Sequence, residues 1–283
     1  MRNRVVILAL LLLVACRSAQ PIKFSGKTAI EQVEAQMKLG PRPTGSDAWQ
    51  ATGDYIISQL KKYGWTIEEQ RFDYRGTAIR NIIGRKGKGP VMILGAHYDT
   101  RRRADRDKTN PTAPVPGADD GASGVAVLLE LAHSLDAGKL HNQVWLAFFD
   151  AEDNGGLDGW EWTVGSRYMA QQLKVKPEAV IVVDMIGDAD QQIYFEQNSN
   201  REWNERIWRV AATLGYDRYF IPQPGRALFD DHTPFAQHGI PVVDNIDFDY
   251  PYWHTTADTS DKLSPDSLER VGRTLQVLLE QSQ

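Results

Sequence analysis

Cysteine is nearly absent from this chain, which has 283 residues and a single cysteine, Cys16. That scarcity excludes an intramolecular disulfide, and it leaves no thiol for catalysis in the rest of the chain. A basic surface is also missing: the formal net charge is −5, so we expect no binding to nucleic acid. The one basic run, Arg101 to Arg103, precedes Asp105 and Asp107, and we expect a solvated loop there. Internal repeats and low-complexity linkers are absent too, and the length fits one large domain or two small ones.

The N-terminus has the pattern of a secretory signal peptide. Two arginines precede an apolar core over residues 5–15, which is too short to span a membrane comfortably. The exit "LVAC" resembles the bacterial lipoprotein processing box, in which the cysteine is lipidated and becomes the mature N-terminus; the alternative is a plain signal peptide cleaved nearby. We therefore expect an exported protein with a signal peptide (1–16), a short tether (17–28) and a single catalytic domain (29–283). The lipid on Cys16 would anchor it to a membrane of the bacterial cell envelope, facing the extracytoplasmic side.

Apolar strands alternate with amphipathic helices in the remaining chain. The patterns predict strands at 65–74, 80–86, 90–99, 143–150, 179–187, 193–197 and 241–248, and helices at 29–40, 48–64, 124–135, 201–216 and 264–281. This alternation predicts an α/β fold with three layers, α/β/α, around a central twisted sheet that is mixed but mostly parallel. In such sheets the ligand site lies beyond the carboxyl ends of the strands.

Carboxylates and histidines follow successive predicted strands. The set comprises His97, Asp99, Asp119, Asp120, Asp150, Glu152, Asp153, Asp184, Asp230, Asp231, His232 and His254. Carboxylate and imidazole together are ligands for a divalent metal, and zinc is the expected ion. A metal would also offset the negative charge that the buried acidic groups bring together.

Each member of this set has a simpler interpretation that the residues alone leave open. Asp119 or Asp120 could cap the helix that follows, and His97 could be a hydrogen-bonded core histidine. Asp231 and His232 could be a capping pair. We expect Asp150 to be structural, because its side chain alternates away from its neighbours.

Eight segments resemble the zinc exopeptidases of the leucyl aminopeptidase type, a family that also contains the glutaminyl-peptide cyclotransferases (glutaminyl cyclases). They are "GPRPTGS", "GAHYDT", "PGADDGASGVAVLLELA", "FFDAED", "GSRYMA", "VVDMIGD", "DDHTPFAQHGIPVV" and "WHTTADT". They occur in family order from about residue 29 to the end. The resemblance implies a zinc-exopeptidase-like fold and a zinc-dependent enzyme that acts on the N-termini of peptides or proteins, expected to be a monomer.

The resemblance also implies roles for individual residues. Asp120, Asp153 and His254 would be the metal ligands, with Asp153 standing where most relatives have glutamate. Glu152 would be the general acid/base. In the aminopeptidases of the family, His97 and Asp184 complete a second zinc site that Asp120 bridges.

Three features favour the cyclase branch. Glu152 and Gly165 are thirteen positions apart, and the inserted loop carries Trp160 and Trp162; cyclases have a similar insertion with a pocket tryptophan. Asp230, in "DDH", resembles a cyclase residue that acts with the equivalents of Glu152 and Asp184. Trp253 directly precedes His254, as in cyclases.

We therefore predict a cyclase with one zinc that converts N-terminal glutamine to pyroglutamate and releases ammonia. Its catalytic residues would be Glu152, Asp184 and Asp230, and Trp160, Trp162 and Trp253 would wall its pocket, although ordinary packing could explain the tryptophans. The alternatives are a di-zinc aminopeptidase and a catalytically silent binding protein.

Overall fold

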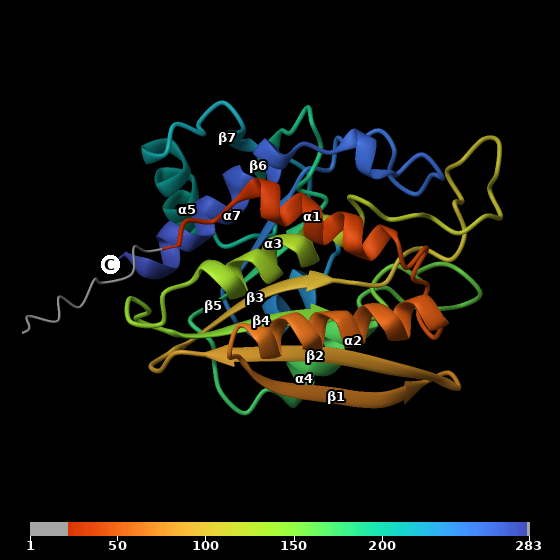
Figure 1. Ribbon diagram of the computed structural model, residues 1–283, viewed down its shortest axis with the longest axis horizontal. Helices are drawn as coiled ribbons and strands as arrows, with labels where there is room; N and C mark the ends of the chain where they lie inside the picture. Colours follow the sequence, from red (N-terminus) through yellow and green to blue (C-terminus); the bar gives the residue numbers. More distant parts are fainter. Residues whose placement is uncertain (1–21, 282–283) are drawn as a thin grey trace, which may run out of the picture.

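A six-stranded mixed sheet forms the centre of the protein, of which the computed structural model describes residues 22–281 (Figure 1). The strand order is β1-β2-β4-β3-β5-β8. The β1–β2 and β2–β4 pairs are antiparallel, and the β4–β3, β3–β5 and β5–β8 pairs are parallel. The strands are β1 (Thr66–Tyr74), β2 (Thr77–Lys86), β3 (Val91–His97), β4 (Gln143–Phe149), β5 (Ala179–Asp184) and β8 (Val242–Ile246).

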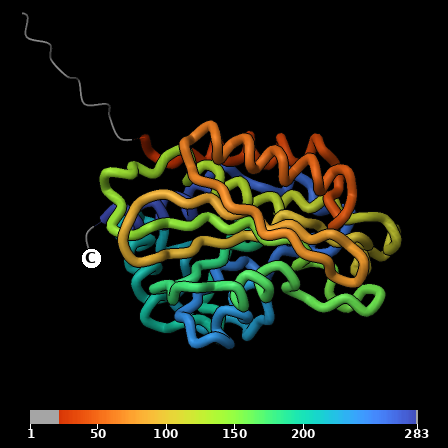
Figure 2. The backbone as a smooth tube through the Cα atoms, turned by 90° about the horizontal axis from the view of Figure 1, so that it is seen from below, coloured from red at the N-terminus to blue at the C-terminus, as the bar shows by residue number. Residues whose placement is uncertain are grey.

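Both faces of the sheet are covered, as the continuous apolar strands predict. Along β4, Leu146 and Phe148 belong to the apolar cluster on one face, whereas Trp145, Ala147 and Phe149 belong to the cluster on the other. Figure 2 shows the N-terminal helices on one side of the sheet and later segments on the other. The first layer holds α1 (Gly26–Met37), α2 (Asp47–Lys62), α3 (Ala122–Ser134), α5 (Arg201–Thr213) and α7 (Pro265–Glu280); the second holds α4 (Val164–Gln172) and α6 (His232–Gln237). The predicted three-layer α/β/α architecture is confirmed.

Local sequence explains where several elements begin and end. The Ser46 and Ser264 side chains accept hydrogen bonds from backbone amides in the first turns of α2 and α7, at 3.1 and 3.2 Å. After α2 the chain turns at Gly64, whose positive φ of 73° a residue with a Cβ rarely adopts. The sequence patterns did not predict β7 (Phe220–Pro224), which contains two prolines and pairs only with the short strand β6 (Ile193–Phe195).

The folded domain begins before residue 29, where the sequence analysis placed its start. Phe24 is buried on α7, where its ring occupies the space in which a side chain at Gly272 would lie. Its backbone amide donates to Gln276 at 2.9 Å. The predicted signal peptide and Cys16 lie outside the described residues. Within residues 22–281, no helix has both the length and the apolar character that crossing a membrane requires.

Candidate metal centre and active site

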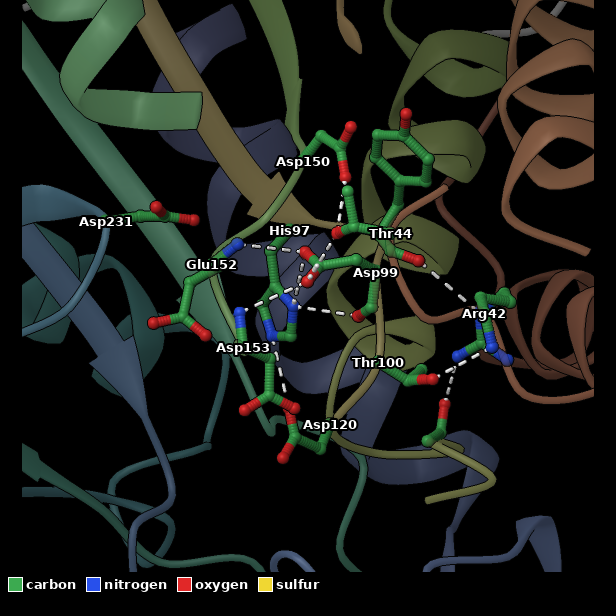
Figure 3. A network of polar contacts seen from close by, with 12 residues as sticks. Arg42, Thr44, His97, Asp99, Thr100, Asp120, Asp150, Glu152, Asp153 and Asp231 are labelled. Atoms are coloured by element: carbon green, nitrogen blue, oxygen red, sulfur yellow. Dashed lines mark hydrogen bonds and ion pairs between the residues drawn. The ribbon is translucent and has the colours of Figure 1, made fainter. Parts of the chain in front are cut away.

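The parallel strands bring predicted site residues to one edge of the sheet; Figure 3 shows His97, Asp120, Glu152 and Asp153 close together. His97 ends β3, Asp184 ends β5, and Glu152 and Asp153 follow β4. Asp120 precedes α3 in the connection from β3. Among the described residues, three groups have potential ligand atoms within 4.8 Å of one another: Asp120–Asp153–His254, His97–Asp120–Asp184 and Asp230–His232–Asp244. The first two are the triads that the family resemblance implies. Asp120 belongs to both triads.

The donor set of the first triad fits zinc. His254 Nε2 lies 3.0 Å from Asp153 Oδ1 and 3.7 Å from Asp120 Oδ2. Asp120 Oδ2 and both Asp153 carboxylate oxygens are buried, yet they accept no hydrogen bond from any described residue. Buried carboxylate oxygens without donors are costly, and a divalent cation would satisfy all three. Imidazole nitrogen and carboxylate oxygen are both protein ligands of zinc, and three protein ligands leave a position open for substrate.

In the second triad, one imidazole nitrogen lies close to both carboxylates. His97 Nε2 lies 3.1 Å from Asp184 Oδ1 and 3.2 Å from Asp120 Oδ1, and Nδ1 lies 3.1 Å from the backbone carbonyl of Asp99. Burial alone would lower the pKa of His97, but the facing carboxylates outweigh it and raise that pKa well above its usual value. This triad can therefore be satisfied by an imidazolium or by a second cation.

Two buried carboxylates, Asp99 and Asp258, fix the loops that carry the ligands. Asp99 accepts hydrogen bonds from the backbone amides of Glu152 and Asp153, at 3.1 and 3.2 Å (Figure 3). Asp258 accepts from the backbone amides of Asp119 and Asp120, at 2.8 and 3.2 Å. Sequence reasoning noted Asp99 without a role and missed Asp258, although both lie in the quoted segments "GAHYDT" and "WHTTADT".

His254 is oriented by a carboxylate that the sequence analysis also missed. Asp105 Oδ1 lies 3.4 Å from His254 Nδ1, and the Asp105 carboxylate accepts two hydrogen bonds from Arg101, at 2.7 and 2.8 Å. A carboxylate behind a ligating imidazole fixes its tautomer and raises its basicity. Asp105 and His254 are far apart in the chain, so no motif spacing could have revealed the pair.

The basic run at Arg101 is not the solvated loop that the sequence predicted. Arg101 is only 3% exposed, and it donates to the backbone carbonyls of Asp153 and Gly155 at 3.1 and 3.2 Å. Its Nη1 lies 3.5 Å from Asp153 Oδ1, and its guanidinium lies 4.9 Å from the centre of the Trp162 ring. The cation is therefore buried because the acidic site and the inserted loop pair with it.

Glu152 lies in a cavity of about 220 Å³ between the two triads and the loop that precedes α6. Burial raises the pKa of Glu152 well above its usual value; His97 opposes the shift, and Asp230 and Asp153 add to it. A buried glutamate with a raised pKa is suited to take up and return a proton. The lining residues are Asp120, Glu152, Asp153, Trp162, Asp184, Met185, Ala227, Leu228, Phe229, Asp230, Ile246, Phe248, Trp253 and His254.

Two of the three predicted tryptophans line this cavity. The Trp162 ring is parallel to the His254 imidazole, with centroids 6.1 Å apart, and the Trp253 ring lies 4.0 Å from the same imidazole. A Cβ at Gly155 would lie 2.0 Å from the Trp162 ring, so only glycine permits this placement of the indole. Trp160 does not line the cavity. It packs instead with Ile79, Ala151 and Val164 and edge-on against Tyr74, because the inserted loop folds back over β1 and β2.

The simpler interpretations of the acidic residues are resolved by their contacts. Gly121 is the N-cap of α3 without a side-chain cap, while Asp119 accepts from the Gly187 amide at 2.7 Å. Asp150 is structural: its carboxylate accepts from Thr44 at 2.9 Å and from the Arg80 amide at 2.8 Å. His232 begins α6 and faces Asp244 and Glu196, at 3.3 and 3.5 Å, rather than capping the helix.

Backbone strain is concentrated at the same edge of the sheet. Ala151, Met185 and His254 have φ values of 57°, 43° and 58°, a left-handed conformation that costs free energy for residues with a Cβ. Each is a site residue or adjoins one. At this edge of the sheet, the backbone therefore adopts unfavourable conformations that set the orientation of the site residues.

Comparison with known proteins gives the family. The sequence profile of peptidase family M28 matches residues 81–279. The chain belongs to this family. The "Glutaminyl-peptide cyclotransferase-like protein" of Mus musculus is 28% identical, over 84% of this chain and 71% of the mouse protein.

Solved structures of the family have the same fold. The glutaminyl cyclase of Porphyromonas gingivalis is 34% identical, with a TM-score of 0.84 over 91% of this chain and 98% of that chain. A Zn-dependent exopeptidase of Parabacteroides distasonis is 31% identical, with a TM-score of 0.87 over 93% of this chain and 100% of that chain. A protein named glutaminyl cyclase and a protein named Zn-dependent exopeptidase therefore share this overall structure. The fold alone does not distinguish a cyclase from a peptidase, so the residues around the cavity must do so.

Proposed function

We propose that this protein is a zinc-dependent glutaminyl-peptide cyclotransferase, which converts the N-terminal glutamine of peptides or proteins to pyroglutamate and releases ammonia. The observation that carries the proposal is the inserted loop after Glu152, which places Trp162 beside the candidate zinc ligand His254. Trp162 and Trp253 both line the cavity of about 220 Å³ that contains Glu152. The similarity to proteins named glutaminyl cyclase supports the same activity.

The residues around the cavity account for the chemistry. Asp120, Asp153 and His254 would hold the zinc, which when bound acts as a Lewis acid on the side-chain amide carbonyl of the substrate. Glu152 accepts a proton from the substrate α-amine as the bond from its nitrogen to the side-chain carbonyl carbon forms. It returns the proton to the amide nitrogen as that carbon–nitrogen bond breaks and ammonia leaves. Asp184 and Asp230 line the same cavity and would position Glu152 and the leaving group.

The apolar walls favour cyclisation over hydrolysis. Intramolecular attack needs the α-amine held against the side-chain carbonyl, and a narrow pocket supplies that orientation. Trp162, Trp253 and Phe248 line the cavity, and such apolar walls would disfavour a water molecule as a hydrolytic nucleophile.

The proposal includes one zinc ion per chain, a monomer, and attachment through a lipid on Cys16 to a membrane of the bacterial envelope. The N-terminal signal pattern supports the lipid anchor, and the buried carboxylate oxygens of the Asp120–Asp153–His254 triad support the zinc. We expect Cys16→Ser to release the protein from the membrane fraction of a bacterial host; retention there would contradict lipidation at this residue.

The second candidate is a di-zinc aminopeptidase, which the geometry of the His97 triad and the similarity to a Zn-dependent exopeptidase favour. The deciding experiment uses protein lacking residues 1–16, loaded with zinc, and two peptides that begin with glutamine or leucine. Mass spectra showing loss of one ammonia from the glutamine peptide, with the leucine peptide intact, are expected. Removal of the whole first residue, from leucine at least as readily as from glutamine, would establish the aminopeptidase.

A further inference from the structure

A second cavity, of about 190 Å³, adjoins the one that contains Glu152. Leu228, Ile246 and Phe248 line both cavities, so the two share one wall. Phe248 packs against Trp253, with ring centroids 4.8 Å apart, which extends the apolar wall from the candidate zinc ligands to the second cavity. We call this second cavity the side groove; it is lined by Tyr194, Glu196, Pro224, Gly225, Arg226, Leu228, Ile246, Phe248 and Asp249.

One stretch of chain, residues 224–230, lines the two cavities in succession. Pro224 to Arg226 face the side groove, Leu228 lines both cavities, and Phe229 and Asp230 face the cavity with Glu152. Phe229 is 51% exposed, which is unusual for a large apolar side chain in this structure. An extended ligand that leaves the catalytic cavity can therefore follow this stretch into the side groove.

The stretch is held in place by the chain on its other side. The Gly225 amide donates to the Phe195 carbonyl at 2.7 Å, and the Leu228 amide donates to Glu196 at 2.8 Å. The Arg226 carbonyl accepts from the Gln197 amide at 2.9 Å. The groove is thus preformed, and a bound side chain would cost little ordering of the protein.

The charged groups of the side groove are already ion-paired or hydrogen-bonded within the protein. Arg226 pairs with Asp249 at 3.3 Å and lies 5.3 Å from the centre of the Phe248 ring. The Glu196 carboxylate accepts from Leu228, Asn198 and Ser199. With these groups engaged, the remaining surface is apolar and aromatic, and it suits an uncharged side chain.

We propose that the side groove binds the side chain of the second residue of the substrate, the one that follows the N-terminal glutamine, and prefers an aromatic or large aliphatic group. This proposal rests on the proposed function, because the glutamine must occupy the cavity with Glu152 for the next residue to reach the groove. Tyr194 and Phe248 would contact the bound side chain, and an acidic side chain would gain no free cation there.

The test measures ammonia release from the peptides Gln-X-Ala-Ala-amide, with X as Phe, Leu, Ala or Asp, and from glutamine amide. We expect kcat/KM to be about tenfold higher with Phe or Leu than with Ala, a difference of about 1.4 kcal/mol, and lowest with Asp. In Tyr194→Ala the ratio of kcat/KM for the Phe peptide to that for glutamine amide should fall several-fold. A matched control is Tyr168→Ala, which removes a half-buried tyrosine stacked on Phe72 in the opposite layer and should keep the ratio.

The outcomes separate the two proposals. Equal kcat/KM for all X, or an unchanged ratio in Tyr194→Ala, would overturn the assignment of the groove. Ammonia release from the same peptides would still support the cyclase. Absence of ammonia from every substrate, glutamine amide included, would overturn the proposed function itself.

Discussion

The two histidine triads at the carboxyl edge of the sheet share Asp120 but differ in what stands behind each imidazole. His254 Nδ1 lies 3.4 Å from the Asp105 carboxylate, whereas His97 Nδ1 lies 3.1 Å from the neutral backbone carbonyl of Asp99 and farther, at 3.8 Å, from the Asp99 carboxylate. A carboxylate behind the ring makes the other nitrogen a better metal ligand than a carbonyl does. The structure thus favours metal binding at His254 more strongly than at His97.

The carboxylates of the two triads differ in the same direction. Asp184 and Asp120 Oδ1 already face an imidazole nitrogen at 3.1 and 3.2 Å. In the His254 triad, His254 Nε2 lies 3.0 Å from Asp153 Oδ1, but Asp120 Oδ2 lies 3.7 Å from the imidazole, and Asp153 Oδ2 accepts no hydrogen bond within residues 22–281. An imidazolium at His97 can pair with both carboxylates of its triad at hydrogen-bond distance, whereas each carboxylate of the His254 triad keeps one buried oxygen that an added cation would satisfy. Nearly equal ligand geometry can therefore produce unequal metal sites, and a one-zinc enzyme can retain the residues of a two-zinc relative.

The largest expected effect comes from removing a ligand of the His254 triad. We expect Asp153→Ala to lose its zinc and its activity, because only Asp120 and His254 would remain as ligands. Metal content by atomic emission and ammonia release would be measured together. Asp158→Ala, an exposed aspartate of the same inserted loop, should retain both. Full zinc occupancy in Asp153→Ala would show that the metal is bound at the His97 triad. The His97 triad would then be the stronger metal site of the two.

The next largest effect concerns Glu152, which lies close to both triads without joining either. We expect Glu152→Gln to keep its zinc and to lose about 10²–10⁴-fold in kcat, the usual contribution of a positioned general acid/base. If Glu152→Gln keeps its zinc and has a nearly normal kcat, Glu152 is not the general acid/base. If the variant loses its zinc, Glu152 is a metal ligand instead.

Much of this comparison was accessible from the sequence, because parallel strands place their carboxyl ends together. The apolar runs before His97, Asp150 and Asp184 predicted the strands, and the fold then predicted that the residues after them would meet. The two triads follow from that topology together with the family resemblance. The α/β/α layers could be predicted for the same reason.

The parts that could not be predicted depend on contacts between distant loops. Asp105 and Asp258 act through a side chain and backbone groups that no local pattern links to them. Arg101 looked like part of a solvated basic run, but its pairing with Asp105 and the inserted loop buries it. Trp160 and Trp162 are two residues apart, and the fold of the inserted loop sends one into the β1–β2 packing and the other to the cavity.

A smaller effect is expected at Asp105, which distinguishes the two imidazoles. Asp105→Asn removes the negative charge behind His254 but keeps the size of the side chain, so zinc affinity should fall by about 10–100-fold. Competition with a chelator of known affinity would measure it, and Asp158→Asn is the matched control on an exposed aspartate. An unchanged affinity would mean that Asp105 serves only to hold Arg101.

The smallest effect is expected at His97, and it tests the comparison most directly. If His97 is an imidazolium in a one-zinc enzyme, His97→Ala should keep one zinc and change activity only a few-fold, since neither the zinc ligands nor Glu152 is removed. His97→Gln, which leaves less empty space, provides a second variant in case the cavity impairs folding. Zinc content and kcat/KM would be measured for both. Halved metal content with abolished activity would show that the two triads act together, as the aminopeptidase alternative requires.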